Sequence, residues 1–187
     1  MSTVYLFLAD GFEDMEAVAT RDVLVRGDVD VRTVSITDEP FVTSSHGLTV
    51  QADLMREDFD GISLERDDVL VFPGGMPGSR NLAQDAGLIA CMQAHYAAGG
   101  PVAAICAAPG LVASQLDPVE GKRFTCFEGF QGPMCAKGAV YTPEGAVIDG
   151  HLITGRAAGH AVTFGLAILR YIKGDAALAK VKEGLML

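Results

Sequence analysis

The sequence predicts an α/β fold of flavodoxin-like type, in which a doubly wound, mainly parallel sheet carries helices on both faces. Two observations predict this fold. Short runs rich in β-branched and aromatic residues alternate with segments of helical spacing. These runs are apolar almost throughout, as is typical of parallel strands buried on both faces. Because the chain has 187 residues, 49% of them hydrophobic, we expect one domain over residues 1–187.

The first half of the chain begins this alternation. The run VYLFLA predicts a first strand, and the turn sequence Ser45-His46-Gly47 predicts a short hairpin. In order, we expect a strand at 4–9, a helix at about 13–26, a strand at 31–36, the hairpin at 42–52 and a strand at 69–72.

The second half continues the alternation. Leu88, Met92 and Tyr96 recur at the spacing of one helix face. In order, we expect a helix at 85–98, a strand at 102–105, a helix at 107–114, strands within 139–154, a helix at about 161–172 and a short helix at 175–182.

Three loops follow expected strands at the edge where a doubly wound sheet binds its ligands. They lie at 10–16, 74–78 and 106–109. Ligands of such sheets bind beyond the carboxyl ends of the strands. We therefore expect these loops to share one crevice.

Composition and charge argue against several classes of partner. The net charge is −10 and the densest basic cluster is Lys122-Arg123, which argues against nucleic acid. No apolar stretch approaches the roughly 18 residues that span a bilayer, so we expect no membrane partner. The first apolar run is not preceded by the basic residues that begin a signal peptide, so we expect a cytoplasmic protein. The four cysteines lack C-x-x-C spacing, so we expect free thiols and neither a metal nor another cofactor.

Cys106 is the main candidate for a reactive residue. The expected strand ends at Ile105, and the small residues Ala104 and Ala108 flank the cysteine, as in a nucleophile elbow with a thiol in place of a hydroxyl. The N–H groups of the following helix favour thiolate over thiol. Alternatively, Cys106 is a small core residue, because free cysteines are often buried.

The Gly74-Gly75 pair follows the expected strand at 69–72. Adjacent glycines let the backbone approach a ligand and turn its N–H groups inward. Beside Cys106, this loop and the Ala107 N–H are candidate donors to an oxyanion. Alternatively, the glycines only make a tight turn between strand and helix.

The acidic residues Glu13, Asp14 and Glu16 open the first expected helix. Glu13 and Asp14 are expected to face water as partners of the helix dipole. Glu16 adjoins an apolar run and can point into the crevice, where burial would raise its pKa and suit it for general acid and base catalysis. The spacing alone favours a solvated Glu16.

The histidines give no sign of a Cys–His dyad. Cys106 is followed by Ala107, and no His-x-Glu sequence is present. We expect His95 on a helix surface. His46 is expected to be an ordinary residue of its turn, or alternatively to reach the rim of the pocket.

Three segments together resemble the DJ-1/ThiJ/PfpI superfamily. They are LADGFEDME at 8–16, FPGG at 72–75 and AICAAP at 104–109. Within it, the chain is similar to the DJ-1/YajL branch rather than the PfpI branch, whose cysteine is followed by histidine. The resemblance covers essentially the whole chain, ending with TGRAAG at 154–159 and the helix after it.

The resemblance implies roles for several residues. Cys106 matches the oxidation-prone nucleophile, Glu16 the protonated glutamate that hydrogen-bonds its sulfur, and Gly75 and Ala107 the backbone donors, with Gly74 also in the pocket.

The resemblance also implies a homodimer whose partner subunit brings Arg26 and His46 near the pocket. His46 replaces the arginine common at its position, and Phe127 stands near a histidine that lines the pocket in some relatives. Since Phe127 cannot transfer a proton, Glu16 is the expected acid and base.

The implied activity is that of a cofactor-independent glyoxalase III or deglycase acting on a small reactive carbonyl. A thiolate adds to an α-oxoaldehyde such as methylglyoxal as a hemithioacetal, and a carboxyl then shuttles the proton to give lactate. Alternatively, the family resemblance implies a redox-regulated sensor or chaperone in which Cys106 is oxidised under oxidative stress. Older family names imply a role in thiazole biosynthesis.

Overall fold

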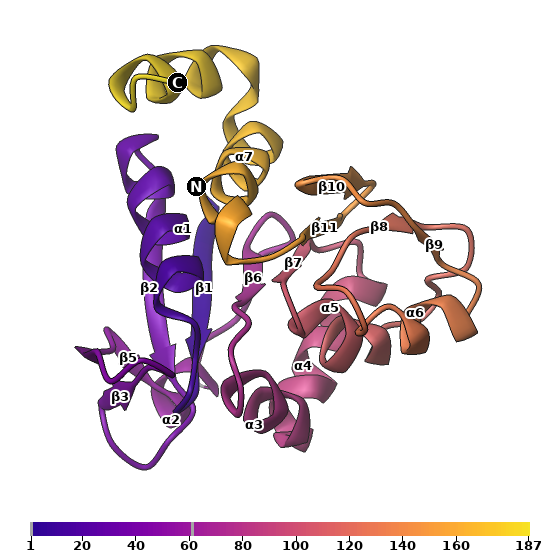
Figure 1. Cartoon of the computed structure of the whole chain (residues 1–187). Coiled ribbons are helices and arrows are strands. Elements are labelled where there is room, and N and C mark those ends of the chain that lie inside the picture. The colour runs from indigo at the N-terminus through magenta and orange to yellow at the C-terminus, as the bar shows by residue number, and fades with distance from the viewer. Residues whose placement is uncertain (1, 61) are drawn as a thin grey trace.

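The main sheet is mostly parallel and lies at the centre of the fold (Figure 1). The computed structural model describes residues 2–60 and 62–187. Within those residues, the sheet has seven strands in the spatial order β10 (Ala146–Asp149), β11 (Leu152–Gly155), β7 (Val102–Ile105), β6 (Val69–Phe72), β1 (Thr3–Leu8), β2 (Asp30–Ser35) and β5 (Leu54–Met55). The pair β10–β11 is antiparallel, and the other neighbouring pairs are parallel.

Helices and two small ribbons surround this sheet. The helices are α1 (Asp14–Arg26), α2 (Arg56–Asp60), α3 (Gly78–Gln84), α4 (Ala86–Ala97), α5 (Ala108–Leu111), α6 (Gly132–Ala136) and α7 (Ala161–Gly184), with 3-10 turns at Ala113–Gln115 and Ala158–His160. The ribbons are β3 (Phe41–Thr43) with β4 (Thr49–Gln51), antiparallel, and β8 (Arg123–Phe124) with β9 (Val140–Tyr141), parallel. Among the described residues, no helix has both the length and the apolar character needed to cross a bilayer.

Alternate residues of each central strand pack into two separate cores. In β1, Tyr5 and Phe7 belong to a core that includes residues of α2, α3, α4, α5 and α6. Val4 and Leu6 belong to the other core, with residues of α1 and α7. Burial on both faces explains why these strands are apolar throughout. The predicted α/β fold, with helices on both faces of a mainly parallel sheet, is confirmed.

The predicted elements agree with the structure best where they are buried. The strands predicted at 69–72 and 102–105 coincide with β6 and β7, and the hairpin predicted at 42–52 matches β3 and β4 except that β3 begins one residue earlier, at Phe41. The last two predicted helices form α7, interrupted only at Gly174, whose φ is +78°. The helix predicted at 107–114 is wrong in length: α5 ends at Leu111 and a 3-10 turn follows.

An aromatic cluster crosses the first core. The ring of Phe7 stacks on Phe72 at 5.1 Å and meets the edge of Phe59 at 4.9 Å. All three side chains are at most 2% exposed, so an alanine at the centre would leave a cavity.

Phe7→Ala is expected to lower the free energy of unfolding by about 3–5 kcal/mol, because it removes a fully buried ring. Urea denaturation measures the loss. Phe41→Ala is the matched control, since Phe41 is 56% exposed and its loss is expected to stay within about 0.5 kcal/mol. Equal losses in the two variants would contradict the assignment of Phe7 to a packed core.

Candidate active site

The loops after β1, β6 and β7 pack together at the carboxyl ends of these neighbouring strands. The Glu13 N–H donates to the Gly74 carbonyl over 3.0 Å, and the Gly78 N–H donates to the Gly11 carbonyl over 3.3 Å. A Cβ atom at Gly74 would lie 2.5 Å from the Cβ atom of Cys106. The three loops therefore meet, as the topology predicts.

Cys106 occupies a sharp corner between β7 and α5. Its φ is +65°, a left-handed conformation that costs a non-glycine residue roughly 1–2 kcal/mol. Two backbone hydrogen bonds hold it: the Cys106 N–H donates to the Gly155 carbonyl over 3.0 Å, and its carbonyl accepts from the Phe127 N–H over 2.8 Å. Cys106 is only partly buried, unlike an ordinary core cysteine. Such strain persists where the surrounding structure fixes it, which is common at functional sites.

Gly74 and Gly75 leave the space that the site needs. A Cβ atom at Gly74 would lie 3.1 Å from the sulfur of Cys106 and would collide with the carboxyl of Glu16. Gly75 has a φ of +89°, and a Cβ atom there would collide with the backbone of the loop after β1. The backbone N–H groups of Ala107 and Gly75 both act to lower the pKa of the Cys106 thiol. The close approach therefore requires glycine at both positions, which a simple tight turn would not.

Glu16 is fully buried in the first turn of α1. Its Oε2 accepts the Gly74 N–H over 2.7 Å, and Oε1 has no hydrogen-bond partner among the described residues. Burial raises the pKa of Glu16 to about 7, and the charge of Glu13 adds to this, whereas hydrogen bonds from the Cys106 thiol and the Gly74 N–H oppose it. The solvated position favoured by the spacing is wrong, because the first turn of α1 faces the glycine loop.

The thiol of Cys106 is also held in its protonated form. Burial raises the pKa of Cys106 to about 12, the Glu16 carboxylate adds to this through its charge and its hydrogen bond, and the Ala107 and Gly75 N–H groups oppose it. The thiolate-favouring environment expected from the helix N-terminus is therefore outweighed. Titrations of such close groups belong to the pair, so between these values the two residues share one proton and one negative charge.

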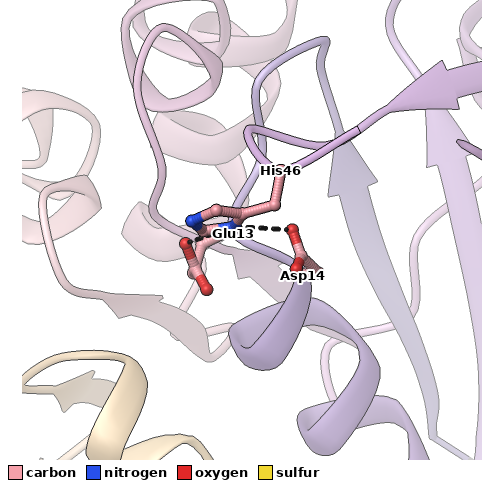
Figure 2. A group of neighbouring side chains, drawn as sticks. All are labelled: Glu13, Asp14 and His46. Atoms are coloured by element: carbon pink, nitrogen blue, oxygen red, sulfur yellow. Dashed lines mark hydrogen bonds and ion pairs between the residues drawn. The ribbon is translucent and has the colours of Figure 1, made fainter. Parts of the chain in front are cut away.

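A second polar group lies beside this pair. The Nδ1 atom of His46 is 3.1 Å from Oδ1 of Asp14 and 3.6 Å from Oε2 of Glu13 (Figure 2). A hydrogen bond with Ser44 lowers the pKa of Asp14, and a hydrogen bond with Asp14 raises the pKa of His46. The expectation that Glu13 and Asp14 simply face water is wrong, because their side chains are 14% and 25% exposed beneath the His46 turn.

Two predicted pocket residues lie at different distances from the thiol. Phe127 adjoins Cys106 through its backbone, and its half-exposed ring meets Phe130 edge to face at 6.3 Å. Arg26 ends α1, about 15 Å along the helix from Glu16 at the usual rise per residue, and pairs there with Asp22. Within one chain, therefore, Arg26 does not reach Cys106.

Sequence reasoning misplaced His95 and missed two contributors to the site. His95 is 7% exposed, because its Nε2 lies 2.8 Å from the Asp68 carbonyl. Two groups were not predicted from the sequence. The Gly155 carbonyl accepts the N–H of Cys106, and the Ser44 hydroxyl accepts the N–H of His46 over 3.2 Å. A backbone carbonyl or a single serine has no sequence pattern that identifies it as part of a site.

Comparisons with known proteins agree with this geometry. The model of the DJ-1/PfpI family matches residues 2–171. Protein DJ-1 homolog A of Arabidopsis thaliana is 31% identical over 185 residues, or 99% of this chain and 46% of that protein, so the chain spans about half of its length. The glutathione-independent glyoxalase DJR-1.2 of Caenorhabditis elegans is 28% identical over 92% of this chain and 89% of that protein. A deglycase of Pyrococcus abyssi is 31% identical over 83% of this chain and 90% of that protein.

A solved structure is similar over the full length. The crystal structure of a DJ-1 superfamily protein from Salmonella typhimurium has a TM-score of 0.89 and 31% identity, and the match covers 100% of this chain and 98% of that one. Since the family model covers nearly all of the sequence and the fold agrees, the chain belongs to the DJ-1/PfpI family.

Proposed function

We propose that the chain is a cofactor-independent enzyme of glyoxalase III or deglycase type, acting on methylglyoxal-like α-oxoaldehydes or their adducts. The observation that carries the proposal is the pairing of Cys106 with a buried Glu16, whose pKa is raised to about 7. A carboxyl of this kind exchanges a proton near neutral pH, as a general acid and base must. The activities for which the Caenorhabditis glyoxalase and the Pyrococcus deglycase are named support this reaction class.

The first step uses the singly charged form of the pair. The Cys106 thiolate attacks the aldehyde carbon, the S–C bond forms, and the carbonyl oxygen takes the proton of Glu16 to give a hemithioacetal. The N–H groups of Gly75 and Ala107 are the proposed donors to the developing oxyanion.

The second step moves hydrogen between the two substrate carbons. The Glu16 carboxylate removes the proton from the former aldehyde carbon and returns it to the neighbouring carbon, while the hydroxyl proton moves to the second oxygen. The product is a lactoyl thioester. Water then attacks its carbonyl carbon and the C–S bond breaks, which regenerates the Cys106 thiolate. One proton of the water returns to Glu16, and the other is released with lactate.

Glu16→Gln is expected to reduce lactate formation from methylglyoxal by about a hundred- to ten-thousandfold, because the proton relay is lost. Cys106 should still be alkylated by iodoacetamide in this variant. Glu57→Gln, an exposed glutamate on α2, is the matched control and should keep full turnover.

Two outcomes would count against the enzyme. One is a loss below about tenfold in Glu16→Gln, since general acid and base catalysis contributes far more. The other is negligible turnover by the wild type together with peroxide oxidation of Cys106 to the sulfinate, which would favour the redox-sensing function.

The raised pKa of Glu16 also predicts how stability depends on pH. Between the unfolded pKa of 4.5 and the folded value of about 7, the folded state holds a proton that the unfolded state has lost, so stability falls as pH rises. Glu16→Gln removes this dependence. Relative to the wild type, it should gain about 3 kcal/mol in free energy of unfolding between about pH 4 and pH 8. Urea denaturation at both pH values measures this, and parallel stability curves would contradict a buried, protonated Glu16.

We also propose a homodimer formed through α1, as the family resemblance implies. Met15, Val18 and Val25 on α1 are 57%, 48% and 45% exposed, and Leu48 in the β3–β4 turn is 46% exposed. These apolar side chains would be covered by a second copy.

Val18→Asp is expected to convert the dimer into monomers, because it places a charge within the proposed interface. Light scattering at micromolar concentration measures the mass. Val140→Asp is the matched control, since Val140 is 50% exposed but lies on β9, and it should leave the dimer intact. A monomeric wild type would overturn the proposal.

A further inference from the structure

Glu13, Asp14 and His46 form a cluster of metal-ligating side chains that the proposed reaction does not use. Among residues 2–60 and 62–187, this is the one group of at least three such side chains whose ligand atoms lie within 4.8 Å of one another. The residues come from two segments, the start of α1 and the β3–β4 turn (Figure 2).

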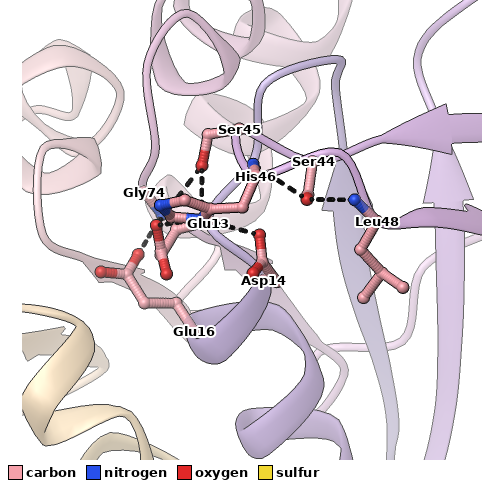
Figure 3. Close-up of polar contacts among 8 residues, drawn as sticks. All are labelled: Glu13, Asp14, Glu16, Ser44, Ser45, His46, Leu48 and Gly74. Carbon is pink, nitrogen blue, oxygen red and sulfur yellow. Dashed lines mark hydrogen bonds and ion pairs between the residues drawn. The ribbon is translucent and has the colours of Figure 1, made fainter.

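Backbone hydrogen bonds hold these two segments together. The Ser45 N–H donates to the Phe12 carbonyl over 2.8 Å, and the Gly11 N–H donates to the Thr43 carbonyl over 2.8 Å. Within the turn, the hydroxyl of Ser44 accepts the N–H groups of His46 and Leu48 (Figure 3). The imidazole is therefore held over the two carboxylates by the fold and not only by its own side-chain contacts.

The ligand atoms have the spacing of a metal coordination shell. With bonds of about 2.0–2.2 Å, neighbouring nitrogen and oxygen ligands lie roughly 2.8–3.6 Å apart in octahedral or tetrahedral geometry. The Nδ1 atom of His46 lies 3.1 Å and 3.6 Å from the two carboxylate oxygens. A single ion can therefore contact all three atoms after small movements of the side chains.

The charges at this place are also unbalanced. The carboxylates of Glu13 and Asp14 are largely covered, and among the described residues His46 is the only ion-pair partner of either. The carboxyl of Glu16 lies close by, near enough for the charge of Glu13 to act on it. One imidazolium, that of His46, neutralises at most one of the two carboxylates of Glu13 and Asp14. The cluster therefore favours the binding of a further positive charge.

We propose that Glu13, Asp14 and His46 bind a divalent first-row transition-metal ion at the rim of the Cys106 crevice. One imidazole and two carboxylates are ligands that Mn²⁺, Fe²⁺, Co²⁺ and Zn²⁺ accept, and water fills the remaining positions. The ion replaces the proton on Nδ1 of His46 and lies between this nitrogen and the carboxylate oxygens of Glu13 and Asp14. Ser45, whose hydroxyl lies 3.4 Å from Oε2 of Glu13, supports that carboxylate from outside.

Titration of the full chain with Co²⁺ tests this site without any need for turnover. We expect saturable binding of one ion per chain, with a visible spectrum of nitrogen and oxygen ligands and no thiolate charge-transfer band. His46→Ala and Glu13→Gln should each weaken Co²⁺ binding by at least about tenfold, the lower end of what loss of even an outer-shell partner costs. His46→Gln, which keeps the size and polarity of the side chain, should show the same loss.

Two controls separate this site from other ligands. His160→Ala removes a partly buried histidine on the 3-10 turn before α7, and Cys106→Ser removes the thiol of the crevice. Both should bind Co²⁺ as the wild type does. Unchanged affinity in His46→Ala, the absence of saturable binding, or a thiolate band that disappears in Cys106→Ser would each overturn the proposal. Since every readout is a binding measurement, the site stands or fails separately from the glyoxalase activity.

Discussion

The burial of Glu16 beside Cys106 is the constraint on which the rest of the site depends. A carboxyl with no exposed surface, and with one oxygen lacking a hydrogen-bond partner among the described residues, is stable mainly in its protonated form. This requirement fixes the residue at Gly74, where a side chain would displace either the carboxyl or the sulfur. The thiol and the carboxyl consequently behave as one titrating unit, not as a reactive cysteine with a helper.

The order of the strands brings these distant residues together. Glu16, Gly74 and Cys106 follow β1, β6 and β7, which are neighbours in the sheet. Both faces of these strands are buried, so a shift of one residue in register would exchange the two cores. The positions of the strand ends, and with them the meeting of the three loops, are therefore determined by packing far from the crevice.

The sequence predicted the parts of the structure that have a strong local signal. Strands β6 and β7, the meeting of the three loops and the close approach at the two glycines follow from apolar runs and from residues with special backbone freedom. Helices of five to seven residues, such as α2 and α3, are too short to show a period. The burial of Glu16 and His95, and the raised pKa of Cys106, depend on neighbours distant in sequence. Spacing within one helix, or the helix dipole considered alone, does not contain that information.

The left-handed backbone of Cys106 places stability and reactivity in opposition at one position. A glycine would adopt a φ of +65° without steric cost, so the least strained chain would carry no sulfur there. A cysteine held in this conformation therefore carries a steric cost that a glycine at the same position would avoid. A glycine at position 106 would relieve this strain and leave the glycine loop and the buried carboxyl in place, but it would remove the thiol that they surround.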